Sequence, residues 1–241
     1  MNNKTGTLYG IGVGPGDPEM ITLKAVKILK KVDMIFAASS SKNQHSQAVN
    51  IAKTHIPDTA KVEMLPFPMT KDKSVAQKVW DEHARKIITL LEQGQDVAFV
   101  TLGDSMVYAT YGYILQSIQK LAPLLNIVSI PGITSFQAAA SRLNRPLVEG
   151  EESLLLLSGA NGGDRLRQFA GKAENVVILK AYKKVKDIVS ALDETGMMEK
   201  SVAITSCGLH NEEVIKDIKT LEKRPPEYWT LILAKGTKKN G

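Results

Sequence analysis

A glycine-rich loop near the N-terminus carries the strongest chemical signal in this chain of 241 residues. An apolar run from Leu8 to Val13 leads into the loop sequence GPGDPEM, and a helical pattern follows. Small-ligand sites form where a strand passes through such a loop into a helix, because glycine lets the backbone approach a ligand closely and permits positive φ. The pattern therefore predicts a ligand-binding corner.

The spacing of the loop argues against a dinucleotide as the ligand. A G-x-G-x-x-G fingerprint counted from Gly10 or from Gly12 would need glycine where the chain has Pro15 or Asp17. Proline has no amide proton to donate, and an aspartate carboxylate would repel a pyrophosphate. The sequence also contains no G-x-x-x-x-G-K-[ST] phosphate loop. We expect a ligand that is not held by phosphate groups, with a purely structural turn as the alternative.

Two further corners of the same kind follow along the chain. One apolar strand leads into the loop LGDSMVY (102–108), and another leads into PGITSFQAAA (131–140). In a parallel sheet all three corners fall at the carboxyl edge, where ligands bind. The candidate contact residues there are Gly103, Asp104, Thr134 and Ser135. Each has an ordinary alternative role as a turn or a helix cap, but their combination favours a site.

Alternating strand and helix patterns in the first half predict an α/β fold with a mainly parallel sheet. The expected strands are 7–13, 33–37, 96–101 and 126–130, and the expected helices are 22–31, 45–55, 74–93, 107–121 and 135–143. Thr22 is the expected N-cap of the first helix.

The polar segment 145–153 divides the chain, and strands dominate after it. The expected strands there are 153–159, 174–182, 201–208 and 228–236, with helices near 163–170 and 184–195. These β-branched and leucine-rich runs predict a smaller mixed sheet. We therefore expect two α/β domains, 1–146 and 147–241.

Composition excludes several classes of protein. The chain is 43% hydrophobic with a net charge of +6, and no apolar run approaches the ~20 residues that span a bilayer. It has no arginine-rich block or aromatic stripe for nucleic acid. The N-terminus lacks the apolar core of a signal peptide, and the single cysteine, Cys207, fits a reducing cytosol, so we expect a cytoplasmic protein. The four histidines are scattered without metal-ligand spacing, so we expect no protein-bound catalytic metal.

Three of these motifs together resemble a known family. The sequences YGIGVGPGDPEMITLKAVKILKKVDMI, TLGDSMVYATYGYIL and IPGITSFQAAASRLNRPLVEG are similar, in this order, to the three conserved motifs of the tetrapyrrole (corrin/porphyrin) methylases. The similarity continues to YWTLILAKG near the C-terminus and so covers essentially the whole chain. Within the family, the second and third motifs most resemble the precorrin-2 and cobalt-factor II C-20 methyltransferases of cobalamin biosynthesis.

The resemblance implies a two-domain α/β enzyme, usually a homodimer, with S-adenosylmethionine bound in the cleft between the domains. It implies cofactor contacts at Pro15, Gly103, Asp104, Ser105, Val107, Thr134, Ser135, Leu179, Lys180, Ala181, Cys207, Gly208 and Thr230. For a tetrapyrrole substrate with many carboxylates, the candidate residues are Gly14, Pro15, Arg142 and Arg145, with Arg85 and Arg165 as further options. Arginine suits carboxylates because it binds them in a bidentate manner. The polar segment 39–47 is a candidate flexible rim over the macrocycle.

Methyl transfer from a sulfonium needs alignment more than a catalytic group. A base could assist proton loss from the methylated carbon, and Asp104, Tyr108 and Tyr111 are candidates, each with cofactor binding or core packing as the alternative role. The family usually has Gly-Asp-Pro in the second loop, where this chain has Ser105, and this departure loosens φ at that position and adds a hydroxyl.

Several alternative functions remain open from the sequence. They are methylation at another ring position, diphthine synthesis on a protein, a nucleotide-dependent oxidoreductase, and a non-catalytic S-adenosylmethionine-binding protein. The sequence also leaves open whether the substrate carries cobalt.

Overall fold

The computed structural model describes residues 5–40 and 46–236, which divide into two compact units between Thr134 and Ser135. Most of the candidate rim, 39–47, lies outside the described residues. The division falls earlier than the expected boundary after Pro146. The reason is that helix α5 (Ser135–Arg142) packs against strand β10 (Thr230–Lys235) of the second unit.

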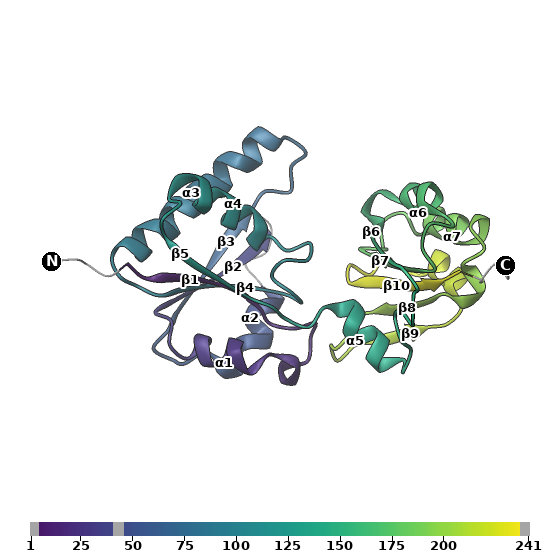
Figure 1. Ribbon diagram of the computed structural model, residues 1–241, viewed down its shortest axis with the longest axis horizontal. Helices are drawn as coiled ribbons and strands as arrows, with labels where there is room; N and C mark the ends of the chain where they lie inside the picture. Colours follow the sequence, from purple (N-terminus) through teal and green to yellow (C-terminus); the bar gives the residue numbers. More distant parts are fainter. Residues whose placement is uncertain (1–4, 41–45, 237–241) are drawn as a thin grey trace. The chain divides into compact units, whose positions relative to one another are not determined.

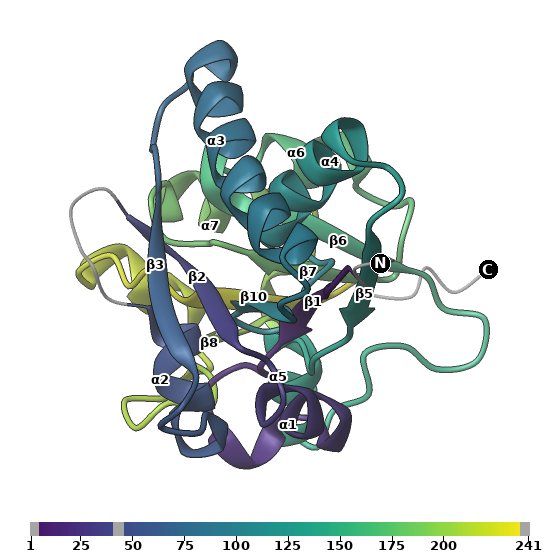
Figure 2. The same ribbon diagram turned by 90° about the vertical axis from the view of Figure 1, so that its left-hand side faces the viewer.

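The first unit contains a parallel sheet of five strands in the order β3-β2-β4-β1-β5 (Figures 1 and 2). The strands are β1 (Thr7–Gly12), β2 (Met34–Ser40), β3 (Lys61–Phe67), β4 (Val97–Thr101) and β5 (Asn126–Ile130). Strand β1 lies between β4 and β5, in register Gly12↔Thr101 and Ile11↔Ile130. The three glycine-containing loops therefore leave neighbouring strands at one edge of the sheet.

Helices cover both faces of this sheet, as Figure 1 shows. The helices α3 (Lys73–Glu92) and α4 (Tyr111–Leu121) lie on one face, and α1 (Leu23–Leu29) and α2 (Gln47–Ala52) lie on the other. Side chains alternate along each strand, so Val97 and Phe99 pack in one core and Ala98 and Val100 in the other. Thr22 caps α1 as expected, since its hydroxyl accepts a hydrogen bond from the Ala25 amide.

The second unit contains a mixed sheet in the order β6-β7-β10-β8-β9. Its elements are β6 (Leu154–Ser158), α6 (Asp164–Phe169), β7 (Asn175–Leu179), α7 (Val185–Glu194), β8 (Val202–Thr205), β9 (Glu213–Ile215) and β10. Among the described strands of this sheet, β6 and β7 alone pair in parallel, and β10 runs antiparallel to both its neighbours. The carboxyl ends of β7 and β8 therefore share one edge with the start of β10.

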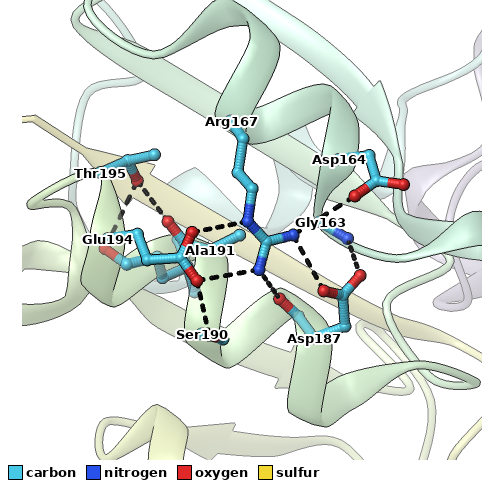
Figure 3. Close-up of polar contacts among 9 residues, drawn as sticks. Gly163, Asp164, Arg167, Asp187, Ser190, Ala191, Glu194 and Thr195 are labelled. Atoms are coloured by element: carbon cyan, nitrogen blue, oxygen red, sulfur yellow. Dashed lines mark hydrogen bonds and ion pairs between the residues drawn. The ribbon is translucent and has the colours of Figure 1, made fainter.

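Arg167 joins the two helices α6 and α7 of this unit (Figure 3). Its guanidinium donates to Glu194 through Nε at 2.6 Å and Nη2 at 3.0 Å, and to Asp187 through Nη1 at 2.8 Å. The second carboxylate oxygen of Asp187 accepts from the Gly163 amide at 2.7 Å. We call Arg167, Asp187 and Glu194 the helix clasp.

Three elements differ from the sequence-based expectations. Strands β3 and β9 were not expected, and α4 begins at Tyr111 rather than at residue 107. Tyr108 has φ +49°, a left-handed conformation that an α-helix does not accommodate, so the helix starts after it. No described helix is both long and apolar enough to cross a membrane.

Candidate active site

The three loops at the carboxyl edge of the first sheet pack backbone against backbone. Gly14 and Gly103 form a two-way bridge, with N–O distances of 3.2 and 2.7 Å. A Cβ on Gly132 would lie 2.2 Å from the Gly103 carbonyl oxygen, and a Cβ on Gly12 would lie 2.6 Å from the same oxygen. Glycine is therefore required at these contacts because any side chain would separate the loops.

Gly103 itself borders open space. Its φ is +69°, and a Cβ at this residue would meet only the Ile133 carbonyl oxygen, at 4.0 Å. The left-handed conformation favours glycine, while the open space leaves room for a ligand beside the loop backbone.

Asp104 connects the second loop to the third. Its Oδ1 accepts from the Met106 amide at 2.8 Å, and its Oδ2 accepts from the Gly132 amide at 2.9 Å. Both carboxylate oxygens are thus committed to backbone donors. This commitment supports a loop-fixing role for Asp104 over that of a proton acceptor.

Ser105, the departure from the family's usual proline, adds a second link between the same loops. Its side chain is fully buried, and its hydroxyl donates to the Ile130 carbonyl at 3.2 Å, where β5 ends. A proline could not make this hydrogen bond. The hydroxyl ties the loop to the sheet at the position where the family relies on the rigidity of a ring.

The two tyrosine candidates differ in position. Tyr111 is fully buried in the core, where its ring lies against Gly10 and its hydroxyl lies 3.2 Å from the Ser129 hydroxyl. Burial raises the pKa of Tyr111, which disfavours it as a base. Tyr108 is half exposed in its left-handed conformation, so it remains the accessible candidate.

The remaining candidates of the first unit follow these contacts in sequence. Pro15 comes directly after the bridged Gly14, which has φ +86°. Val107 lies between Met106 and Tyr108, and Thr134 is the last residue of the unit. The structure thus gathers Gly14, Gly103, Asp104 and Ser105 at one edge of the sheet.

A second set of candidates meets at the shared strand edge of the second unit. Lys180 follows β7 with φ +58°, and the Ala181 amide donates to the Thr230 carbonyl at 3.0 Å. Ser206 follows β8 with φ +50° and donates its amide to the Trp229 carbonyl at 3.1 Å. Left-handed non-glycine residues cost free energy and cluster at functional sites.

Cys207 and Gly208 belong to a turn that Glu212 holds. Glu212 Oε2 accepts from the Gly208 amide at 2.8 Å, and its Oε1 forms an ion pair with Arg142 Nε at 2.7 Å. Burial, together with the nearby Glu212 carboxylate, raises the pKa of Cys207 to about 12, so its thiol is protonated and unreactive. We call Arg142, Glu212 and Gly208 the turn clamp.

The turn clamp changes the interpretation of Arg142. This residue was a candidate for binding substrate carboxylates, but in the structure it pairs with a carboxylate of its own unit at the end of α5. Arg145 makes no ion pair with any described residue, so it is the better placed of the two to meet an external carboxylate. Its neighbour Asn144 has φ +48°.

A cavity of about 270 Å³ opens at the same strand edge of the second unit. Two predicted cofactor residues, Ala181 and Thr230, line it. The lining also contains residues that sequence reasoning missed, among them Tyr182, Asn211 and Glu227. No motif marks these residues, since they lie in polar connections whose folding over the cavity depends on long-range contacts.

The described residues contain no group of three or more histidine, cysteine, aspartate or glutamate side chains that could hold a metal ion. The polar groups at the two strand edges are backbone amides and carbonyls, hydroxyls and carboxylates. Such groups suit an organic ligand rich in hydrogen-bonding groups.

Comparison with known proteins identifies the family of this chain. The family model for tetrapyrrole (corrin/porphyrin) methylases matches residues 7–222. The cobalt-precorrin-2 C(20)-methyltransferase of Salmonella typhimurium is 31% identical over 229 residues, covering 95% of each chain. A probable cobalt-precorrin-2 C(20)-methyltransferase of Methanocaldococcus jannaschii is 38% identical over 180 residues, covering 75% of this chain and 74% of its own.

Solved structures agree on the fold. The uroporphyrin-III C-methyltransferase of Thermus thermophilus, determined with S-adenosylhomocysteine, superposes with a TM-score of 0.64 at 22% identity, covering 95% of this chain and 97% of its own. The resemblance seen in the sequence motifs is therefore confirmed, and this chain belongs to the tetrapyrrole (corrin/porphyrin) methylases.

Proposed function

We propose that this chain transfers a methyl group from S-adenosylmethionine to C-20 of precorrin-2 or its cobalt complex in cobalamin biosynthesis. The observation that carries the proposal is the 31% identity to a cobalt-precorrin-2 C(20)-methyltransferase across 95% of both chains. Both relatives described above are named for the cobalt-bearing substrate, which favours that form. Neither relative is named for another ring position or for diphthine synthesis.

The residues present fit the methyl donor. The open space beside Gly103 admits a ligand next to backbone, and the cavity of the second unit is near the lower end of small-molecule pocket volumes, about 300 Å³. The proposed donor contacts are those predicted from the motifs: Pro15, Gly103, Asp104, Ser105, Val107, Thr134, Ser135, Leu179, Lys180, Ala181, Cys207, Gly208 and Thr230. Of these, Asp104, Ser105 and Cys207 act through the backbone they hold, because their own side chains are engaged or buried.

When bound, S-adenosylmethionine supplies a methyl group already activated by its sulfonium. The contribution of the chain is to hold the reacting groups in line, which can lower the barrier by several kcal/mol. The glycine contacts and the Asp104 and Ser105 hydrogen bonds fix the loops in advance of binding. Gly14, Pro15 and Arg145 are the proposed substrate contacts, and Tyr108 is the accessible group for a proton leaving the macrocycle.

Incubation of the chain with S-adenosylmethionine and each macrocycle tests the proposal directly. We expect mass spectrometry to show one added methyl group on precorrin-2, on its cobalt complex, or on both. Transfer to neither macrocycle would refute the proposed substrate. Thermal stabilisation by NAD(P) without stabilisation by S-adenosylhomocysteine would instead indicate an oxidoreductase.

A pair of glycine variants tests whether the packed loops carry the activity. Gly132→Ala places a Cβ 2.2 Å from the Gly103 carbonyl oxygen, so we expect methyl transfer to fall at least tenfold through misplaced loops. Gly112→Ala is the matched control, because beyond its chain neighbours and its own helix backbone no described atom lies within 4 Å of its Cβ, and it should retain activity. Equal activity in the two variants would contradict the role of the loop contact.

We further propose a cytoplasmic homodimer, as is usual for the family. Light scattering should then give twice the 26.3 kDa mass of one chain.

A further inference from the structure

Two polar side chains of the second unit's cavity, Asn211 and Glu227, are joined through Ser206 by a directed series of hydrogen bonds. Asn211 Nδ2 donates to Ser206 Oγ at 3.0 Å, and Ser206 Oγ donates to Glu227 Oε1 at 3.4 Å. Asn211 and Glu227 both line the cavity. The series of hydrogen bonds thus ends on the Glu227 carboxylate, which accepts hydrogen bonds and donates none.

The backbone that carries Ser206 and Glu227 is fixed by further hydrogen bonds. Ser206 is fully buried in a left-handed conformation, and its amide is bonded to the Trp229 carbonyl. The buried Thr230 hydroxyl donates to the Glu227 carbonyl at 2.6 Å. Glu227 is therefore presented from a fixed backbone, as a group that discriminates between ligands must be.

Glu227 differs from the other carboxylate in the lining. Glu213 is paired with Arg224 at 2.6 Å, and both residues line the cavity. Among the described residues, Glu227 lies in no ion pair, and its one side-chain hydrogen bond comes from Ser206. A partly buried carboxylate without a cation is best satisfied by N–H or O–H donors of a ligand.

We propose that Glu227 reads the exocyclic amino group of the adenine ring of the methyl donor. In the Asn211–Ser206–Glu227 series, two acceptors take no hydrogen bond from a described residue, Asn211 Oδ1 and Glu227 Oε2, and the second Asn211 Nδ2 proton is the one remaining donor. An amino-substituted purine offers donors to match them, whereas a purine without the amino group leaves the carboxylate unsatisfied. This inference rests on the proposed function and makes Glu227 a specificity-determining residue.

Two ligands that differ by one amino group test the inference. The probes are S-adenosylhomocysteine and its 6-deamino analogue, in which hydrogen replaces the amino group, with affinities measured by calorimetry. We expect the unmodified chain to bind S-adenosylhomocysteine about tenfold more tightly than the analogue, the difference that one hydrogen bond to a charged group makes. In Glu227→Ala this ratio should fall close to one, and in Glu227→Gln, which keeps a neutral acceptor, it should be intermediate.

Glu213→Ala is the matched control, because it removes a carboxylate from the same lining that is already paired with Arg224. Its ratio should equal that of the unmodified chain. Because each ratio compares two ligands on one protein, a general loss of folded protein would not change it.

The outcomes separate this inference from the proposed function. If the unmodified chain binds both ligands equally, or if Glu227→Ala weakens both by the same factor, Glu227 does not read the amino group, although the proposed function stands. If the unmodified chain binds neither ligand, the proposed function fails and the inference fails with it.

Discussion

Asp104 shows how a single side chain can set the shape of a binding loop. Its two carboxylate oxygens accept from two backbone amides that lie 26 residues apart in the chain, Met106 and Gly132. The sequence drew attention to Asp104 as a carboxylate for ligand or proton. The structure indicates that the carboxylate holds the backbone of two loops together.

Asp104→Asn tests this role. The amide oxygen can still accept from one backbone amide, but the amide nitrogen would then face the other, and two donors would meet. We expect the free energy of unfolding to fall by about 1–3 kcal/mol, the cost of an unsatisfied buried donor, with a raised KM for S-adenosylmethionine. Urea denaturation measures the first effect and steady-state kinetics the second.

The matched control is Asp58→Asn in an exposed turn of the same unit, which should leave both quantities unchanged. A stability of Asp104→Asn equal to that of the control would contradict the loop-fixing role.

At the scale of elements, the turn clamp joins α5 to the connection after β8. Glu212 bonds Arg142 at the end of α5 and the Gly208 amide in the turn. Burial raises the pKa of Glu212, but the Gly208 amide and Arg142 outweigh it, so the pKa lies below its ordinary value and the carboxylate is charged. Glu212 and Arg142 therefore hold two segments that carry proposed donor contacts, and neither of these two side chains is itself a proposed donor contact.

Glu212→Gln should loosen both segments. We expect KM for S-adenosylmethionine to rise, by up to about tenfold, because one charge-assisted contact is weakened. The kcat should change little, since the reacting atoms are held elsewhere. Glu212→Asp, which keeps the charge, should recover part of the affinity. A fall in kcat with KM unchanged would count against a positioning role.

For the helix clasp we predict an effect on the stability of the protein alone. Arg167→Lys keeps the charge but loses the planar fork that bonds Asp187 and Glu194 together. We expect the melting temperature to fall by about 2–4 °C, and by less in 1 M salt, which screens exposed charges. Arg165→Lys is the control, because the exposed Arg165 makes no ion pair with any described residue. Equal melting temperatures for the two variants would mean that the clasp adds no stability.

The sequence predicted the central strands of the fold better than the edge strands β3 and β9. Strands β1 and β4 are largely apolar and buried, and β5 has three apolar residues among its five, so their patterns were clear, whereas β3 was missed because it carries the charged Lys61 and Glu63 and contains Pro66. The proline is tolerated because β3 is an edge strand. Strand β9 has three residues, too few to show a period.

The site was predictable only where local sequence determines it. Glycine spacing marked the three loops, because the glycines are needed by the loops themselves. The partners of these loops were not visible, since the Asp104–Gly132 and Arg142–Glu212 contacts join residues 28 and 70 positions apart. Asn211 and Glu227 could not be predicted from the sequence either, because only the folded second unit brings them to one cavity.

At the scale of the whole molecule, acid stability depends on carboxylates that hold the second unit together. The Lys235 ammonium, with the Asn175 amide, lowers the pKa of Glu152 to about 2. The Arg167 guanidinium, with the Ser190 hydroxyl, lowers the pKa of Glu194 to about 2. Since both pKa values lie below the ordinary value of 4.5, both residues favour the folded state when they are ionised.

The sign of the pH dependence follows from these shifts. The stabilisation is complete above pH 4.5, where the carboxylates are ionised even in the unfolded chain, and it is lost as the pH falls through about 2. We expect the melting temperature to be level between pH 6 and 7 and to fall steadily from pH 4.5 to 2.5.

Glu152→Gln and Glu194→Gln should each have a lower melting temperature at pH 7. On acidification their melting temperatures should fall by less than that of the unmodified chain, because a neutral amide has no proton to bind. Glu82→Gln is the control, because it removes a carboxylate that lies in no ion pair with a described residue. Its melting temperature should depend on pH as that of the unmodified chain does. If the two variants instead lost as much stability on acidification as the unmodified chain, its acid sensitivity would have to arise from other carboxylates.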